Sequence, residues 1–356
     1  MIYEISERMK KEEIIKTVRC KLIGLTKRKQ ELLDREYNNF LHWLRTGEDK
    51  GVYSAYKQDA KCLYKKAKRM QGIPIRKDLI DIQRRDTKLA KYWARIRVKS
   101  IRGGIRVALK HQPFNFEEWE ICESFLIKND NDFYLYITVK KRVNIRRQYT
   151  SVIAIDIGAH WTVVSVAQHR GKPKFYGKRI RAIRGKYFWL RRELGRRRKL
   201  RAIKKIGQKE RKLVNEELHK ISKDIVIEAE KYNAAIAIGK LENIKNKRRG
   251  RKANRKINSM PSQRLREYIK YKAMERGILV IEVPEYNTSR RCSRCGSMNT
   301  SRPSRGLFVC KDCGYQINAD VNGAQNILKR AVSYMLTAGA LMTEPKRERL
   351  TRSHTP

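Results

Sequence analysis

Four cysteines near the C-terminus have the types and spacing of a metal site. Cys292 and Cys295 form one Cys-x-x-Cys pair, Cys310 and Cys313 form a second, and a glycine follows each pair. Such glycines permit the tight turn of a metal knuckle. Four thiolates at this spacing predict one tetrahedral Zn²⁺ with Zn–S distances of about 2.3 Å. Because no ligand position stays open, the predicted zinc is structural.

Two acidic residues are candidates for a second metal centre. Asp156 lies inside the apolar segment 151–158, so its carboxylate should be largely buried, and a divalent cation is one way to offset the cost of that burial. Asp320 begins a helical segment, where taken alone an N-cap worth about 1 kcal/mol would explain it. Together the two acids suggest a site for two Mg²⁺ ions about 3.5–4 Å apart that hydrolyses phosphodiester bonds. Such a site needs a third carboxylate.

The elements that must position these acids follow a recognisable order. A buried strand with Asp156 is followed by a hairpin partner, basic helices, a second buried strand, a helix, a third strand and a closing helix. This is the order of an RNase H-like α/β core, and the cysteine pairs are inserted before its last helix. The expected elements after the first strand are 161–167, 178–225, 234–239, 263–276, 278–283 and 321–336.

The N-terminal part has a different pattern. Residues 17–25 alternate as a strand, residues 26–98 have helical spacing, and residues 105–143 return to strands with a hairpin turn at Asn129–Asp132. The simplest topology is a β-barrel with a helical insertion after its first strand. The whole chain is therefore expected to be a multidomain α+β protein.

The composition points to a polyanionic partner. The chain has 85 Lys and Arg against 36 Asp and Glu, a net charge of +49, and its basic residues recur along the whole length, as a long nucleic-acid channel requires. No apolar run reaches membrane-spanning length, and no signal pattern begins the chain. Three scattered cysteines, Cys20, Cys62 and Cys122, are typical of reduced thiols. We expect an intracellular, cytoplasmic protein that joins the nucleoid when bound.

Two arginine clusters are candidate nucleic-acid contacts, although a solvated face is the alternative explanation for such charge runs. One lies in the basic helical stretch beside the aromatic run 187–189, and the other surrounds the first cysteine pair. Guanidinium groups bind phosphates in a planar fork. The candidates are Arg191, Arg192, Arg196, Arg197, Arg198, Arg290, Arg291 and Arg294.

The motifs of the C-terminal half resemble those of the TnpB family of transposon-encoded, RNA-guided nucleases. The matching segments are 154–158, 241–244, 288–296, 310–314 and 320–327. The resemblance implies a RuvC nuclease domain, a guide RNA from the transposon end, double-stranded target DNA, and recognition of a short flanking motif by residues 1–145. Base pairing would supply the sequence specificity. A monomer is expected.

One departure from the family concerns the second catalytic acid. In most relatives a glutamate ends the strand that here finishes at Gly239, and glycine cannot bind a metal. Some branches of the family carry the acid after the next strand, and Glu285 fits that arrangement, so the resemblance implies a set of Asp156, Glu285 and Asp320. Glu242 and Glu282 are the rivals. If all three glutamates fail, the protein would bind without cutting, like a guided repressor; a guide-independent accessory nuclease is the third alternative.

The resemblance also gives expected domain boundaries. Residues 1–25 and 99–145 would form the wedge β-barrel, and residues 26–98 the helical recognition insertion. Residues 150–287 and 317–336 would form the RuvC core around a zinc ribbon at 288–316, followed by a tail at 337–356.

Overall fold

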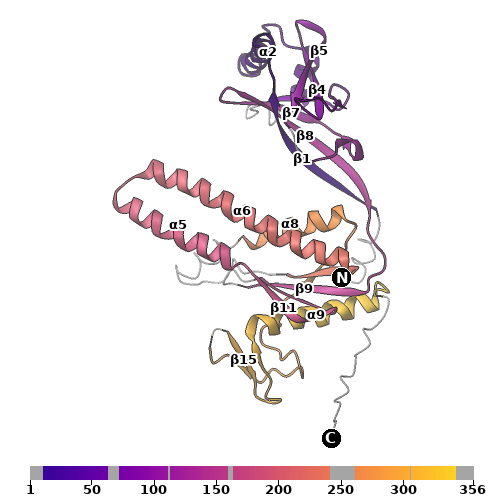
Figure 1. The fold of residues 1–356 in the computed structure, drawn as a ribbon, viewed down its shortest axis with the longest axis vertical. Coiled ribbons are helices and arrows are strands. Elements are labelled where there is room, and N and C mark those ends of the chain that lie inside the picture. The colour runs from indigo at the N-terminus through magenta and orange to yellow at the C-terminus, as the bar shows by residue number, and fades with distance from the viewer. Residues whose placement is uncertain are drawn as a thin grey trace. The chain divides into compact units, whose positions relative to one another are not determined.

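The computed structural model describes residues 11–62, 72–110, 113–158, 163–240, 261–304 and 306–341. The chain divides into two compact units, one formed by Glu13–Arg142 and one that contains the residues from Val143 onward. The expected mixture of α and β structure is confirmed in both units (Figure 1). Within the described ranges, no helix combines the length and apolarity needed to cross a membrane.

The N-terminal unit is built on an eight-stranded sheet with the order β2-β7-β8-β1-β5-β4-β3, and β6 pairs with β8. The expected hairpin turn joins β7 to β8, where Asn129 pairs with Asp132 and Asp130 has a φ of +55°. The end strands β2 and β3 are not paired with each other in the described residues, so the closed barrel stays a prediction. The strands are β1 (Lys11–Ile23), β2 (Ile73–Ile75), β3 (Asp81–Arg84), β4 (Tyr92–Val98), β5 (Ile101–Leu109), β6 (Glu120–Ile121), β7 (Ser124–Asn129) and β8 (Asp132–Asn144).

The expectation of helices throughout 26–98 is only partly right. Helices α2 (Lys27–Thr46) and α3 (Ser54–Cys62) occupy its first half, and Thr26 caps α2 by accepting a hydrogen bond from the Lys29 amide at 3.3 Å. The second half holds β2, β3 and β4 instead. In β4, buried and half-buried residues alternate strictly, which is the period of a strand with one face on the core.

The C-terminal unit contains a five-stranded sheet with the order β11-β10-β9-β12-β13. Strands β9 (Ser151–Ile157), β12 (Ala234–Lys240) and β13 (Val280–Pro284) run parallel, whereas β10 (Val163–Ala167) is antiparallel to β9. The three parallel strands are apolar almost throughout, because helices cover both faces of the sheet. Figure 1 shows α6 (Leu200–Lys231) and α8 (Ser262–Glu275) on one side of β9 and α9 (Ala319–Thr337) on the other.

Two details of this unit differ from the sequence pattern. The edge strand β11 (Arg170–Tyr176) was not expected, since it contains three charged residues and Pro173, all of which an edge strand tolerates. The basic stretch is two helices rather than one, because α5 (Lys178–Arg196) ends before α6 begins and Arg198 between them has a φ of +52°.

Candidate metal centre and nucleic-acid contacts

The carboxyl ends of the three parallel strands meet at one edge of the sheet. Asp156 is the penultimate residue of β9, Gly239 is the penultimate residue of β12, and Glu285 directly follows the end of β13. The register sets Gly239 opposite Val283, near the end of both strands. The topology therefore gathers two predicted site acids at the edge where open α/β sheets place their ligand sites.

Glu285 reaches over the glycine that ends β12. A Cβ atom built on Gly239 would lie 2.7 Å from Cγ and 2.8 Å from Cδ of Glu285, and would also collide with Oε1. The Glu285 carboxylate thus fills the space that a side chain at position 239 would take. A side chain at position 239 would therefore displace the Glu285 carboxylate from this position.

Asp320 lies in the first turn of α9, and its alternative explanation as an N-cap is wrong. Asn318 is the cap, because its Oδ1 accepts hydrogen bonds from the amides of Asp320 at 2.9 Å and Val321 at 3.3 Å. One turn along the same helix, a Cβ atom on Gly323 would lie 2.6 Å from Oδ2 of Asp156. The start of α9 therefore packs directly against the Asp156 carboxylate.

The pKa values of two site carboxyls are raised, because the site holds too little positive charge to balance them. Burial raises the pKa of Asp156 to about 7, and the negative charges of Glu285 and Asp320 add to this effect, while Arg302 and Arg266 oppose it. Burial also raises the pKa of Glu285 to about 7, against the neighbouring charge of Arg266. Both carboxylates would gain from a cation that replaces their protons.

A further observation also indicates that these carboxylates can hold a divalent metal. The Oε1 atom of Glu285 is buried without a hydrogen-bond partner, which is costly for a carboxylate oxygen unless an ion binds there. The ligand oxygens of Asp156, Glu285 and Asp320 do not all lie within 4.8 Å of one another in the described residues. Two ions about 3.5–4 Å apart would be held by acids spread more widely than a single-ion cage.

The rival glutamates have different surroundings. Glu282 points toward α8, where its Oε1 lies 2.8 Å from Nζ of Lys270. Glu242 lies outside the described residues. Of the two described candidates, only Glu285 has an oxygen that is buried and without a hydrogen-bond partner.

The four cysteines come together on a three-stranded sheet. Their sulfur atoms all lie within 4.8 Å of one another, with 3.8 Å between Cys292 and Cys313 and 3.6 Å between Cys295 and Cys310. A tetrahedron with Zn–S bonds of about 2.3 Å has edges of about 3.8 Å, so the sulfur spacing fits one zinc ion. The sheet consists of β14 (Thr300–Ser301), β15 (Leu307–Cys310) and β16 (Gln316–Asn318).

Polar side chains on one face of α9 hold the loop of the first cysteine pair, and this contact was not predicted from the sequence. The buried Asn322 accepts from the Ser293 amide at 2.9 Å and donates to the Arg291 carbonyl at 2.9 Å. Asn326 donates to the carbonyls of Thr288 at 2.8 Å and Arg291 at 2.7 Å. Amide side chains spaced by four residues on an otherwise apolar helix face were the available signal.

The arginine candidates differ in exposure and in whether they pair within the protein. Arg191 forms an ion pair with the buried Glu210 across the α5–α6 hairpin, so its first role is structural. Arg196 and Arg197 pair with Glu193 on the helix surface. Arg192 lies over the ring of Trp189 at 5.2 Å, and that ring is 62% exposed. The exposed candidates are Arg192, Arg196, Arg197, Arg198, Arg290, Arg291 and Arg294.

The aromatic residues near the cysteines serve two different purposes. Phe308 is fully buried against Cys292 and Cys310, where it packs inside the small cysteine domain. Tyr286 is 79% exposed beside Glu285, where it is available to stack on a base. Tyr315 lies under the guanidinium of Arg294, at 5.8 Å.

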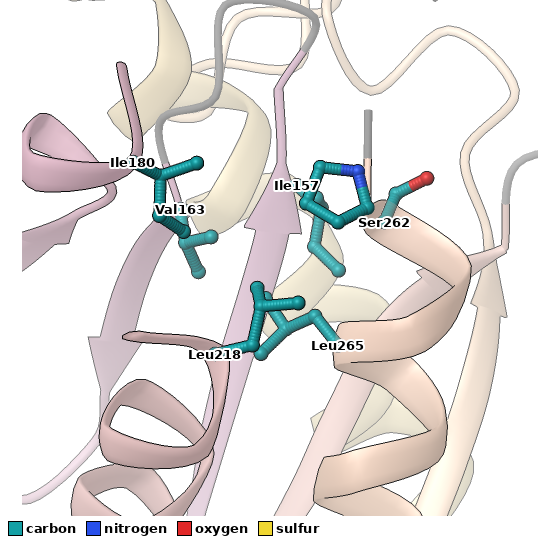
Figure 2. A pocket seen from close by; sticks show the side chains of 7 residues that line it. Ile157, Val163, Ile180, Leu218, Ser262 and Leu265 are labelled. Atoms are coloured by element: carbon teal, nitrogen blue, oxygen red, sulfur yellow. The ribbon is translucent and has the colours of Figure 1, made fainter. Parts of the chain in front are cut away.

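A small cavity near Asp156 is not a substrate site. Figure 2 shows that it is lined by apolar side chains from the ends of β9 and β10 and from helices α5, α6 and α8, with Ser262 at its rim. Its volume is about 20 Å³, room for little more than one water molecule.

Known proteins share stretches of similarity with this chain. The family model of the Cas12f1-like TNB domain matches residues 263–327. TnpB-like protein aq_aa05 of Aquifex aeolicus is 27% identical, over 60% of this chain and 79% of that protein. The CRISPR-associated endodeoxyribonuclease Cas12f2 of a Micrarchaeota archaeon is 29% identical, over 57% of this chain and 41% of its own. The CRISPR-associated endodeoxyribonuclease Cas12f1 of Sulfoacidibacillus thermotolerans is 30% identical, over 59% of this chain and 53% of that protein.

This chain thus spans less than two thirds of both endodeoxyribonucleases. A solved Cas12f1-sgRNA-target DNA complex overlays with a TM-score of 0.49 at 16% identity, covering 72% of this chain and 58% of that one. Similarity at this level supports no conclusion about the chain.

Proposed function

We propose that the chain is a member of the TnpB family and an RNA-guided DNA endonuclease that cuts target DNA at the edge formed by β9, β12 and β13. The C-terminal unit would be an RNase H-like RuvC domain, and the cysteine sheet its inserted zinc ribbon. The guide RNA would come from the transposon end, and residues 1–145 would read the flanking motif. Base pairing would select the target, so that the protein needs only shape and charge contacts along the heteroduplex.

The observation that carries this proposal is the Glu285 carboxylate over Gly239. It supplies an acid at the end of β12, where the strand itself has none, and leaves one oxygen buried without a hydrogen-bond partner. Asp156, Glu285 and Asp320 would hold two Mg²⁺ ions, which when bound would activate water and stabilise the leaving oxygen of a phosphodiester. The protein residues orient these carboxylates and exclude water from one side of them.

The test is cleavage of a plasmid library with randomised flanks by protein purified with the RNA end of its own element. We expect cutting that requires RNA and Mg²⁺ and that falls by at least about 10²-fold in Asp156→Asn, Glu285→Gln and Asp320→Asn. Glu282→Gln is the matched control, since it changes the neighbouring acid that pairs with Lys270, and it should retain activity. Loss of cutting in Glu242→Gln with Glu285→Gln active would assign the third acid to position 242.

Two other outcomes would favour the alternatives. RNA-dependent target binding without cutting would make the protein a guided repressor, with Gly239 as the reason. Cutting that is unchanged after the RNA is removed would make it a guide-independent accessory nuclease.

A further inference from the structure

The loop that carries Glu285 lies outside the strand ladder. Strand β13 ends at Pro284, and the turn that follows contains Asn287 with a φ of +57°. A side chain at the end of a strand is oriented by backbone hydrogen bonds on both sides, whereas a loop side chain has no such support. A metal-binding acid that is located in this loop, rather than at the end of β12, therefore needs other contacts to hold its backbone in place.

One arginine from α9 provides this support on both sides of Glu285. Nη1 of Arg330 donates to the Pro284 carbonyl at 2.6 Å, and Nη2 donates to the Tyr286 carbonyl at 2.6 Å. The carbonyl of Glu285 itself accepts from the amide of Thr288 at 3.2 Å and from its hydroxyl at 3.0 Å. Three consecutive carbonyls are thus fixed, two of them by the planar fork of a single guanidinium.

A second arginine supports the opposite side of the same site. Arg266 on α8 is almost fully buried, donates from Nη2 to the Gly239 carbonyl at 2.5 Å, and lies 3.7 Å from Oε1 of Glu285. This separation is an ion pair rather than a hydrogen bond. Arg266 therefore attracts the carboxylate, but it does not fix the loop from which the carboxylate comes.

We propose that Arg330 is a positioning residue that holds the Glu285 loop, so that a carboxylate from outside the sheet reaches the place left by Gly239. This inference rests on the proposed function. Arg330 contacts the two peptide groups that flank Glu285, and through them it sets the direction of that side chain. A displacement of about 1 Å at a catalytic group lowers the rate by about 10²-fold, so we expect an effect of up to this size when Arg330 no longer holds the loop.

The test compares Arg330→Lys with Lys329→Gln, a change at the exposed neighbouring position of the same helix. Lysine keeps the positive charge but cannot span two carbonyls with a planar fork. In Mg²⁺-free, zinc-loaded protein, we expect Arg330→Lys to weaken Mn²⁺ binding about 10-fold and to lower kcat by about 10–10²-fold at saturating metal and DNA. The Lys329→Gln variant should change neither, and Glu285→Gln gives the baseline for Mn²⁺ bound elsewhere.

A second variant moves the acid back to the strand. Glu285→Gly removes the atoms that a Cβ at position 239 would meet, so the double change Gly239→Glu with Glu285→Gly opens room for a strand-end glutamate. In that background the loop no longer carries a metal ligand, so adding Arg330→Lys should leave Mn²⁺ affinity within about two-fold. A loss of the same size in both backgrounds would assign Arg330 a general structural role and contradict the proposal.

The outcomes separate this inference from the proposed function. If the protein binds RNA and DNA but does not cut, the Mn²⁺ measurements still decide whether Arg330 positions Glu285. Wild-type Mn²⁺ affinity and kcat in a folded Arg330→Lys variant would overturn the proposal. A variant that fails to fold at every temperature would also count against it, because Arg330 would then support the helix rather than the loop.

Discussion

At the scale of single residues, two glycines shape the site because they have no side chain. Gly239 leaves space for the Glu285 carboxylate, and Gly323 lets α9 approach Asp156. Neither glycine has a positive φ, so close approach rather than backbone conformation requires them. Each glycine sits where a methyl group would displace a predicted metal ligand.

Gly323 gives a sharp substitution test. Alanine is favoured over glycine inside a helix by about 1 kcal/mol, but a Cβ here would collide with Asp156. We expect Gly323→Ala to weaken Mn²⁺ binding and to reduce cleavage by at least about 10-fold. The control is Gly207→Ala in α6, where nothing lies within 4 Å of the added Cβ, and which should raise the free energy of unfolding by about 1 kcal/mol with full activity.

The raised pKa of Glu285 predicts a pH-dependent stability in the metal-free protein. A carboxyl whose folded pKa lies near about 7, above its unfolded value, stabilises the fold while protonated and loses that contribution as pH rises through about 7. Glu285→Gln should therefore be more stable than the wild type at pH 8.5, by on the order of 2 kcal/mol.

The measurement is thermal unfolding in Mg²⁺-free, zinc-loaded protein across this pH range. The advantage of Glu285→Gln should shrink below about pH 7 and vanish near pH 4.5, and adding Mg²⁺ at pH 8.5 should stabilise only the wild type. A constant difference at every pH would contradict the assignment. Glu282→Gln is again the matched control.

The sequence could indicate some of these residues but not others. Asp156 stands out because an acid inside an apolar strand needs a partner, and the cysteines stand out by spacing alone. Glu285 needed a family resemblance, since a loop carboxylate has no local signature. Arg330 and Asn326 were missed because their partners are backbone carbonyls 35 to 46 residues away, which no local pattern encodes.

At the scale of elements, α9 connects the candidate metal centre to the cysteine domain. Its first turn carries Asp320, its next turns hold the first knuckle through Asn322 and Asn326, and its later part holds the Glu285 loop through Arg330. A disturbance of this helix face is therefore expected to reach both sites together.

Asn326 tests this connection. Asn326→Ala would leave the carbonyls of Thr288 and Arg291 without these donors, at a cost of about 1–3 kcal/mol. We expect a lower Tm and faster zinc release to a coloured chelator, with a parallel loss of Mn²⁺ affinity at the carboxylates. Lys329→Gln on the same helix should behave as the wild type, and faster zinc release with unchanged Mn²⁺ affinity would show that the two sites are independent.

The elements themselves were predictable wherever one periodicity was sustained. The parallel strands and α9 were found close to their true bounds because their apolar patterns are long. The helical expectation for 26–98 failed at β2, β3 and β4, which are three, four and seven residues long. Strand β2 pairs with β7, which lies far away in sequence, so its own residues carry little signal. Strands β3 and β4 form a local hairpin instead, and the alternation in β4 was a strand signal that the helical expectation overlooked.

At the scale of the whole molecule, the charge of +49 is spread over surfaces that differ in their chemistry. Some of the basic groups are paired within the protein, as where the buried Glu228 contacts Arg170 at 2.6 Å and Lys174 at 2.8 Å. The arginines at the junction of α5 and α6 are exposed instead, next to Trp189. We expect these exposed arginines to bind the phosphates of a nucleic acid.

The salt dependence of nucleic-acid binding distinguishes these groups. Replacing Arg192, Arg196 and Arg198 together by Gln should reduce the slope of log K against log salt by about 2–3, because three fewer counterions are released. Arg191→Gln should leave that slope nearly unchanged. It should lower the Tm, because the buried Glu210 would lose one of its ion-pair partners. Equal slopes for wild type and triple variant would place the nucleic acid elsewhere.

The contact between Gly239 and Glu285 also constrains how such a protein changes by mutation. The two glutamate positions compete for the same volume, because a side chain at 239 would occupy the place of the carboxylate at 285. We therefore expect a lineage that moves the acid from strand to loop to lose one ligand before it gains the other, through an intermediate that binds targets without cutting them. Selection for cutting from a library randomised at both positions should recover either glutamate alone and reject the pair.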